Sequence, residues 1–186
     1  MTLRTLALLG AVCLGANGAA LAQLTPGVTK VVKYAASSMI VTKHVSGHCW
    51  TSSIASPRAD AFRCMTGNEI YDPCFKLDVT AVACPDVAAL NTGVVINLTQ
   101  ALPPAQSPAA SPQAWAMVLQ NGAHCSRATG TVAPGYPYYC SGVRGQCSEP
   151  DLTKRKQAYF VHCAKSVSAQ GKAQDVASTL AQIIYE

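Results

Sequence analysis

The chain has 186 residues, of which 12% are charged, and its formal net charge is +5. Its only basic run is Lys154, Arg155 and Lys156, and aromatic residues do not alternate with that run as a base-stacking platform requires. Nucleic acid is therefore not an expected partner, and the run is interpreted as a solvated loop face.

The first 22 residues are predicted to be an export signal. Arg4 supplies the positive charge, residues 6–15 are apolar, and residues 20–22 (Ala-Leu-Ala) place cleavage before Gln23. The apolar run is too short for a stable membrane span. Lipid attachment at Cys13 is disfavoured, because the residue before it is not small. We expect a secreted protein, extracellular or periplasmic.

Cleavage would leave 164 residues, a formal charge of +4 and eight cysteines. An even cysteine number behind an export signal implies an oxidising compartment and four disulfides. Each disulfide closing a loop of about 10 to 16 residues would stabilise the fold by roughly 3 kcal/mol, so reduction should loosen it severely. Although about 105 pairings are possible, the spacing favours local pairs: Cys49–Cys64, Cys74–Cys84, Cys125–Cys140 and Cys147–Cys163.

The region before residue 70 predicts two strands and one helix. Residues 28–34 and 37–45 are rich in β-branched side chains, which is typical of strands. Ser56-Pro57 then combines an N-cap residue with proline at the first helical position. A short helix is expected over residues 58–65, ending at Gly67.

The middle of the chain predicts a turn, two strands and a long loop. Asp72-Pro73 indicates the turn. Residues 75–82 alternate apolar and polar side chains, which predicts a half-buried strand, and residues 93–99 predict another. Residues 103–112 are rich in proline, alanine and serine, and form either a surface loop or an interdomain linker. A single domain over residues 23–186 is favoured, because halves of about 80 residues would be marginally stable.

The remainder predicts further strands. Asn121-Gly122 is a strong two-residue hairpin signal between residues 114–119 and 123–125. Residues 136–140 resemble an edge strand because of their proline. Residues 157–163 and 176–185 are interpreted as strands, the latter against a helical alternative. The predicted fold class is mostly β (a β-rich α+β fold), a small disulfide-bonded sheet domain with one short helix.

Three histidines directly precede cysteines: His48-Cys49, His124-Cys125 and His162-Cys163. A zinc site could use such residues. In a strand, however, adjacent side chains point to opposite faces, so one dipeptide cannot offer both ligands to one metal. The sequence therefore predicts no metal site and no cofactor.

Two catalytic interpretations are weaker than their structural alternatives. Cys49-Trp50 partly matches the papain-type nucleophile segment, but a free thiol at Cys49 would leave an odd number of cysteines. Glu69 and Asp72 could act as a carboxylate pair in glycoside hydrolysis. Asp72 precedes a proline, however, which is ordinary turn chemistry.

Arg58, Asp60 and Arg63 are expected on the predicted helix beside Trp50. An arginine–aspartate pair there would fix the helix, and Arg63 could alternatively recognise an anionic group. A candidate binding site is assigned to five residues of this region: Trp50, Arg58, Arg63, Glu69 and Asp72.

The run GHCWTSSIASPRADAFRCMTGNEIYDPCF (residues 47–75) resembles uncharacterised secreted or surface-exposed bacterial proteins rich in cysteine. Similar features continue to residue 140, through residues 82–85, 115–122, Cys125, residues 129–130 and residues 139–140. The Cys147/Cys163 pair fits this pattern less well. The resemblance implies an extracytoplasmic, disulfide-bonded domain without a known activity.

The sequence thus favours a non-catalytic binding domain whose partner is an extracytoplasmic protein or a glycan. The alternative is an extracytoplasmic hydrolase with a site near Trp50, Glu69 and Asp72. This preference depends on the lack of recognisable catalytic motifs together with a cross-linked scaffold.

Overall fold

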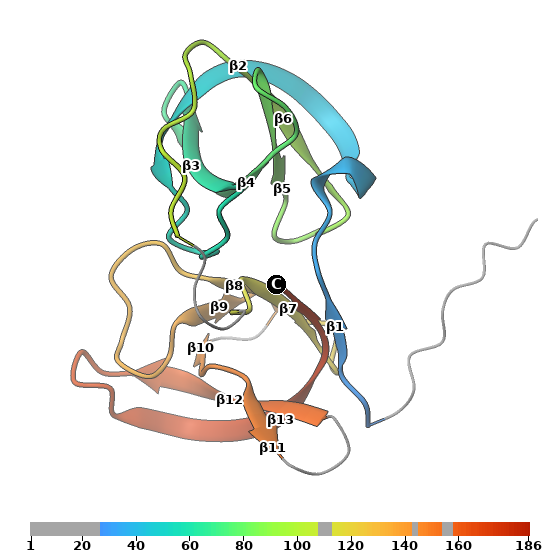
Figure 1. Ribbon diagram of the computed structural model, residues 1–186. Helices are drawn as coiled ribbons and strands as arrows, with labels where there is room; N and C mark the ends of the chain where they lie inside the picture. Colours follow the sequence, from blue (N-terminus) through green and yellow to red (C-terminus); the bar gives the residue numbers. More distant parts are fainter. Residues whose placement is uncertain (1–26, 108–112, 143–144, 154–157) are drawn as a thin grey trace, which may run out of the picture.

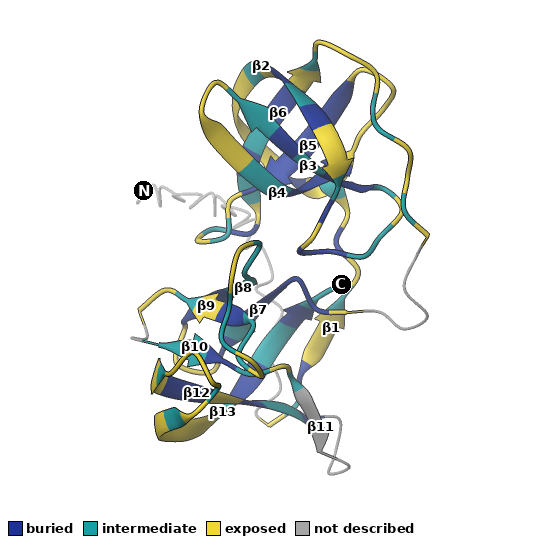
Figure 2. Ribbon diagram, turned by 90° about the vertical axis from the view of Figure 1, so that its left-hand side faces the viewer, coloured by how far each residue is buried: buried dark blue, intermediate teal, exposed yellow. Residues whose placement is uncertain are grey.

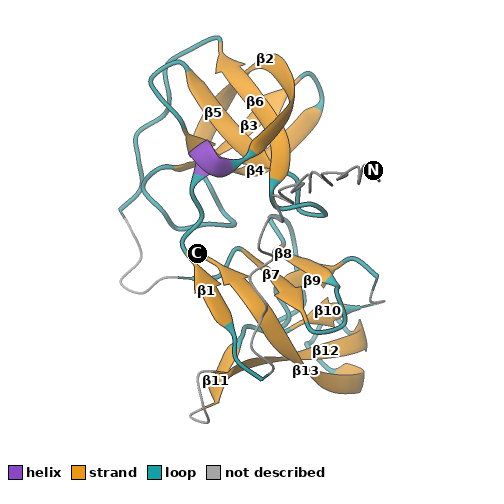
Figure 3. Cartoon of the chain, turned by 90° about the vertical axis from the view of Figure 1, so that its right-hand side faces the viewer, coloured by secondary structure: helices purple, strands orange, loops and turns teal. Residues whose placement is uncertain are grey.

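The computed structural model describes residues 27–107, 113–142, 145–153 and 158–186. The predicted export signal, its cleavage site, residues 108–112 of the proline-rich stretch and the basic run at 154–156 lie outside these residues. The described chain is almost entirely β, and its strands form two lobes (Figure 1). Its one helical element in those ranges is the 3-10 turn η1 (Ala36–Ser38), drawn in purple in Figure 3.

The first lobe is a closed five-stranded barrel. Consecutive strands pair antiparallel, and the last strand returns to pair parallel with the first. Two glycines make the closure possible, because a Cβ atom at Gly47 or Gly93 would overlap a neighbouring main-chain oxygen. The strands are β2 (Ile40–Ser52), β3 (Ala61–Thr66), β4 (Glu69–Lys76), β5 (Ala81–Pro85) and β6 (Thr92–Leu98).

The second lobe is an eight-stranded sheet in which six strands close a ring. The ring runs β13-β7-β8-β9-β10-β12, and β12 pairs again with β13. Strands β1 and β11 extend the sheet at its ends. The strands are β1 (Lys30–Val32), β7 (Ala116–Leu119), β8 (His124–Arg127), β9 (Tyr138–Cys140), β10 (Gln146–Cys147), β11 (Asp151–Thr153), β12 (Ala158–Val167) and β13 (Ala173–Tyr185).

Four aromatic side chains pack where the two barrels meet. Trp115 is fully buried, and its ring centroid lies 5.2 Å from that of Tyr34, 5.5 Å from Phe75 and 6.0 Å from Tyr185. Phe75 comes from the first barrel, whereas Trp115 and Tyr185 come from the second lobe. Figure 2 shows buried residues (dark blue) on the strands of both lobes. The barrels therefore share apolar surface in addition to having their own cores.

The four disulfides pair as expected from the spacing. Each joins cysteines on two neighbouring antiparallel strands, with Cα atoms 3.8 to 4.1 Å apart. Two disulfides lie in each barrel: Cys49–Cys64 and Cys74–Cys84 in the first, Cys125–Cys140 and Cys147–Cys163 in the second.

The helix predicted over residues 58–65 is wrong. Ser56-Pro57 leads into a turn closed by a hydrogen bond from the Ala61 amide to the Arg58 carbonyl at 3.2 Å, and β3 begins directly after it. Cys64 lies directly opposite its disulfide partner Cys49 on β2. Long-range strand pairing thus prevails over a local helix-start signal.

Three other boundaries differ from expectation. Residues 75–82 form a hairpin, because the Asp78 carboxylate accepts hydrogen bonds from the Thr80 amide and hydroxyl and so turns the chain. Asp72-Pro73 lies inside β4 and contains a cis bond. The predicted edge strand over 136–140 is β9, an interior strand between β8 and β10, since Pro137 precedes the strand.

The other predicted strands are confirmed, with shifted ends. Residues 28–34, 37–45 and 93–99 correspond to β1, β2 and β6, and the Asn121-Gly122 hairpin joins β7 to β8. Residues 176–185 belong to a strand, β13, and not to a helix. No helix among the described residues has the length and apolarity that crossing a membrane would require.

Residues 103–107 of the proline-rich stretch lie between β6, the last strand of the first barrel, and β7 of the second lobe. The Gln106 side-chain nitrogen lies within hydrogen-bonding distance of the carbonyl oxygens of Ser53, Ser56 and Arg58, at 3.0 to 3.4 Å. This part of the stretch therefore packs against the first barrel, and whether the two barrels fold as one unit stays a prediction.

Candidate functional site

Trp50 occupies a β-bulge on the outer face of the first barrel. Cys49 pairs with Cys64 and Thr51 with Arg63, so Trp50 has no direct partner on β3. A bulge re-aims the side chain it carries, and Trp50 is 41% exposed. The guanidinium carbon of Arg63 lies 5.6 Å from the centroid of the Trp50 ring, within cation–π distance. One side of the indole is thus supported while much of the ring remains accessible.

Arg63 is held by both barrels. Its terminal nitrogen donates a hydrogen bond to the carbonyl of Thr129, in the loop after β8, at 3.2 Å. Its Nε atom lies 4.0 Å from a carboxylate oxygen of Asp72. The side chain of Arg63 is only 18% exposed, so it supports Trp50 more than it presents a free charge to solvent.

Asp72 organises the loop that follows β2. Its carboxylate accepts hydrogen bonds from the Ser53 hydroxyl, from the Ile54 amide at 3.1 Å and from the Ala55 amide at 3.4 Å. Its side chain is 2% exposed. Burial raises the pKa of Asp72, and the hydrogen bonds and the charge of Arg63 offset only part of that effect. These contacts give Asp72 a structural role that occupies both of its oxygens.

Glu69 lies apart from Asp72. Side chains alternate along β4, so Glu69 and Tyr71 project to one face while Ile70 and Asp72 project to the other. The Tyr71 hydroxyl donates a hydrogen bond to Glu69 at 2.5 Å, which raises the pKa of Tyr71. The two carboxylates that could have formed a hydrolytic pair therefore do not share a face of the strand.

Arg58 connects the first barrel to the end of β13. Its guanidinium binds both carboxylate oxygens of Asp60 at 2.8 and 2.5 Å and donates to the main-chain oxygens of Tyr34 and Glu186 at 2.7 and 3.1 Å. The same group lies 4.6 Å from the Phe75 ring centroid. Burial opposes ionisation of Asp60, but the hydrogen bonds and charge of Arg58 bring its pKa below the ordinary value. Arg58 is thus a structural clamp, and its role is separate from that of Trp50.

A row of three side chains, two of them apolar, continues the Trp50 surface across three strands. His48 pairs with Met65 on β3, and Met65 pairs with Ile70 on β4, so all three share the outer face. The His48 ring centroid lies 6.5 Å from that of Trp50. Ile70 is 53% exposed. Sequence reasoning missed these residues, because only the register of the three strands brings them together.

We call this set the Trp50 face. It consists of the row with its bulge residue and the exposed Ile54 of the adjoining loop: His48, Trp50, Ile54, Met65 and Ile70. Arg63 and Asp72, two of the residues expected at the site, lie beneath it and fix its geometry. Arg58 and Glu69 do not belong to it.

A separate pocket of about 220 Å³ lies where the two lobes meet. Its lining includes Tyr34, Met39, Leu90 and Tyr185 together with the exposed Lys33. Burial raises the pKa of Tyr34 to about 12. None of the five residues assigned to a site from the sequence lines this pocket.

The His-Cys dipeptides follow strand alternation. In the second barrel, Cys125 and Cys163 are buried in the core while His162 is exposed. The sulfur atoms of Cys125, Cys140 and Cys147 lie within 4.8 Å of one another, which is close enough for metal ligands. All three cysteines are engaged in disulfides, however, and offer no thiolate in this state.

No protein-family model matches the chain, and neither a curated protein nor a solved structure shows significant similarity to it. Any functional conclusion therefore depends on the geometry of the chain itself.

Proposed function

We propose that the protein is an exported, disulfide-bonded binding domain without a catalytic centre, and that the Trp50 face is its contact surface. The observation that carries the proposal is the exposed tryptophan, held at a bulge by the Arg63 guanidinium and continued by His48, Met65 and Ile70. Tryptophan, methionine and arginine are enriched at contact surfaces, and buried tryptophans dominate binding energies.

The rigidity of the surface supports a binding role. β2 and β3, which carry most of the face, are joined by Cys49–Cys64 directly behind Trp50. The buried hydrogen bonds of Asp72 fix the loop that carries Ile54. A preorganised surface loses little conformational entropy on binding, so more of its contact energy appears as affinity.

The partner is proposed to be an extracytoplasmic glycan or protein, with a glycan as the first candidate. An exposed aromatic ring can stack on the apolar face of a sugar, and the His48 imidazole beside it can exchange hydrogen bonds with sugar hydroxyls. Four disulfides are compatible with an oxidising compartment outside the cytoplasm. The export signal and the secreted location belong to this proposal.

The alternative function is an extracytoplasmic hydrolase acting near Trp50, Glu69 and Asp72. The geometry gives it less support, since Asp72 is engaged by the Ser53–Ala55 loop and Glu69 points to the other face of β4. Release of soluble sugars from a bound polysaccharide, lost in a Glu69→Gln variant, would favour the hydrolase and overturn the non-catalytic proposal.

The test is co-sedimentation of the oxidised protein with insoluble chitin, cellulose and peptidoglycan, comparing wild type with Trp50→Ala. Val79→Ala is the matched control, because Val79 is 75% exposed on the turn between β4 and β5 and lies outside the Trp50 face. Loss of stacking should weaken binding about 10-fold or more in Trp50→Ala only.

A second arm addresses a protein partner. A photo-crosslinking amino acid at Ile70 should yield a defined adduct with an envelope protein, and Trp50→Ala should abolish it. If the variant and wild type behave alike in both arms, the Trp50 face is not the contact surface.

A further inference from the structure

The four cysteines of the second barrel form a continuous ladder across four neighbouring strands. Cys125 on β8 lies opposite Cys140 on β9, and Cys147 on β10 lies opposite Cys163 on β12. β9 and β10 are themselves neighbours, with Tyr138 opposite Cys147. The two disulfides therefore lie side by side in one layer of the barrel.

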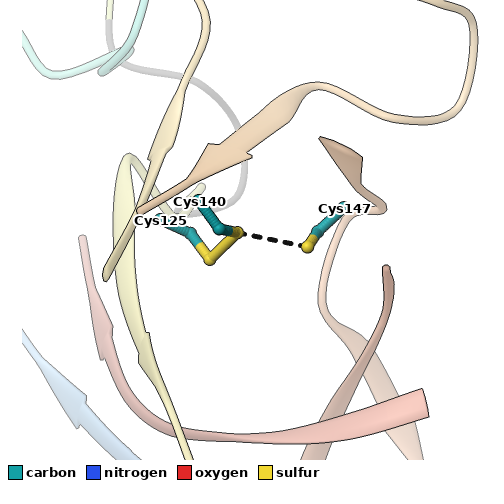
Figure 4. Close-up of side chains that lie close together, drawn as sticks. All are labelled: Cys125, Cys140 and Cys147. Atoms are coloured by element: carbon teal, nitrogen blue, oxygen red, sulfur yellow. Dashed lines mark hydrogen bonds between the residues drawn. A yellow bond between two sulfur atoms is a disulfide. The ribbon is translucent and has the colours of Figure 1, made fainter. Parts of the chain in front are cut away.

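The two disulfides touch through one pair of sulfur atoms. The Sγ atom of Cys140 lies 3.1 Å from the Sγ atom of Cys147, as the dashed line in Figure 4 shows. This distance brings Cys140, if it becomes a thiolate, into contact with the sulfur it would attack in the neighbouring disulfide. The two residues are seven positions apart in the sequence.

Among the eight disulfide cysteines, exposure to solvent is greatest at Cys140. Seven of the eight disulfide cysteines are buried, and Cys140 alone is partly exposed. Cys125 and Cys147 are fully buried, and Cys163 is 6% exposed. Both disulfides of the first barrel are enclosed in its core. Cys140 is therefore the most exposed of the disulfide-bonded residues, and we expect an external thiol to react there first.

We propose that Cys140 is a thiol–disulfide exchange site whose reaction partner is a dithiol, such as the active-site pair of a disulfide oxidoreductase. One thiolate of the dithiol attacks Cys140, breaks the Cys125–Cys140 bond and releases the Cys125 thiolate, which takes up a proton. The second thiolate of the dithiol then releases Cys140, and the dithiol leaves oxidised as a disulfide while the protein has gained two electrons.

A second, internal step follows without any further electrons. The Cys140 thiolate attacks Cys147, forms a Cys140–Cys147 bond and displaces Cys163, whose thiolate takes up the second of the two protons that the dithiol gave up on oxidation. The link between β8 and β9 thus stays open, the link between β10 and β12 opens, and a new link forms between β9 and β10. The product carries one disulfide between β9 and β10 and thiols at the two ends of the ladder, Cys125 and Cys163.

The experiment is graded reduction of the oxidised wild-type protein with dithiothreitol, quenched with acid and N-ethylmaleimide and followed by non-reducing peptide mapping. Trypsin cleaves after Arg127, Arg144 and Lys156, which separates the four cysteines, and cleavage before Asp86 separates Cys84 from Cys125. Cleavage before Asp72 likewise separates Cys64 from Cys74, so every alternative disulfide joins a distinct pair of peptides.

The expected two-electron product contains Cys140–Cys147, with maleimide on Cys125 and Cys163 and both disulfides of the first barrel intact. Two results would overturn the proposal. One is a first-barrel disulfide that opens before those of the second barrel. The other is a product that retains Cys147–Cys163 and carries maleimide on Cys125 and Cys140.

A pair of variants tests the internal step without a reductant. Cys125→Ser leaves a free thiol at Cys140 next to an intact disulfide, and should give a mixture of Cys147–Cys163 and Cys140–Cys147 isomers. Cys64→Ser is the matched control, because it leaves a thiol at Cys49 beside Cys74–Cys84, whose sulfurs do not form such a close group with it. A single Cys147–Cys163 isomer in Cys125→Ser would contradict the exchange step even if the reduction experiment gave no clear order.

Discussion

Replacing Trp115 with alanine should destabilise both barrels at once. The side chain is fully buried and its ring contacts three other aromatic rings, one of them, Phe75, from the other barrel. Truncation of a buried tryptophan costs about 3–5 kcal/mol. For a chain of this length that lowers the melting temperature by roughly 6–20 °C. The variant keeps Trp50 as its only tryptophan, which makes urea unfolding of the first barrel visible by fluorescence.

Hydrogen–deuterium exchange with mass spectrometry distinguishes one folding unit from two. In a single unit, the slowest amides of β5–β6 and of β12–β13 exchange through global unfolding, so Trp115→Ala accelerates both sets by the same factor, about a hundredfold to a few thousandfold. Trp50→Ala serves as the control, because Trp50 is 41% exposed and its loss should leave both sets nearly unchanged. Acceleration confined to β12–β13 would show that the barrels are independent domains and that the shared aromatic cluster does not couple them.

Three further predictions concern single positions. Burial raises the pKa of Asp72 above its ordinary 3.8, so the folded protein binds the carboxyl proton of Asp72 more tightly than the unfolded chain does. The free energy of unfolding should therefore fall as the pH rises from about 4 through the folded-state pKa. Asp72→Asn should remove this pH dependence, measured by urea titrations at several pH values. Gly93→Ala should cost about 1–3 kcal/mol in the same assay, because its Cβ would overlap the carbonyl oxygen of Cys84. Gly130→Ala is the control, because no heavy atom lies within 4 Å of the added carbon, and it should change stability by less than about 0.5 kcal/mol. Equal losses of stability in the two variants would refute the argument that Gly93 is needed for closure of the first barrel. Arg58→Lys should cost roughly 2 kcal/mol in thermal unfolding, since lysine cannot reproduce the guanidinium's simultaneous contacts to a carboxylate and two carbonyls, and an unchanged midpoint would show that this clamp contributes little.

The β character and the disulfide pairing could be predicted because both depend on contacts between neighbours in sequence. Cys125 and Cys140, for example, lie on strands that follow each other in the chain and pair directly. The parallel pairing of β2 with β6 could not be predicted in this way, because about 50 residues separate the partners and no turn signal connects them. The helix over 58–65 was wrongly predicted for a related reason, since the Ser56-Pro57 signal is local and the strand partner of Cys64 is not.

The site was predictable only in part. Trp50, Arg63 and Asp72 do interact, but no local pattern in the sequence indicates that Arg58 and Glu69 lie elsewhere. Their separation follows from side-chain alternation along β4 and from the turn before β3, which replaces the expected helix. The Cys140–Cys147 contact was likewise hidden, since it is a diagonal contact between strands whose register the spacing of the cysteines does not determine.

The disulfides of the two barrels differ in their exposure to solvent. The binding proposal and the exchange proposal can therefore be tested separately. The Trp50 face depends on Cys49–Cys64, whose cysteines are at most 2% exposed, whereas Cys140 in the second barrel is partly exposed. Mild reduction should therefore change the pairing in the second barrel while the Trp50 face stays intact. Arg63 is the one described side chain of that face's support that reaches the second barrel, through the Thr129 carbonyl. If rearrangement of the ladder weakens binding at Trp50, the effect reaches the first barrel through this hydrogen bond, the shared aromatic cluster or the contacts of Arg58 with Tyr34 and Glu186. Arg63→Lys should remove only the first of these connections.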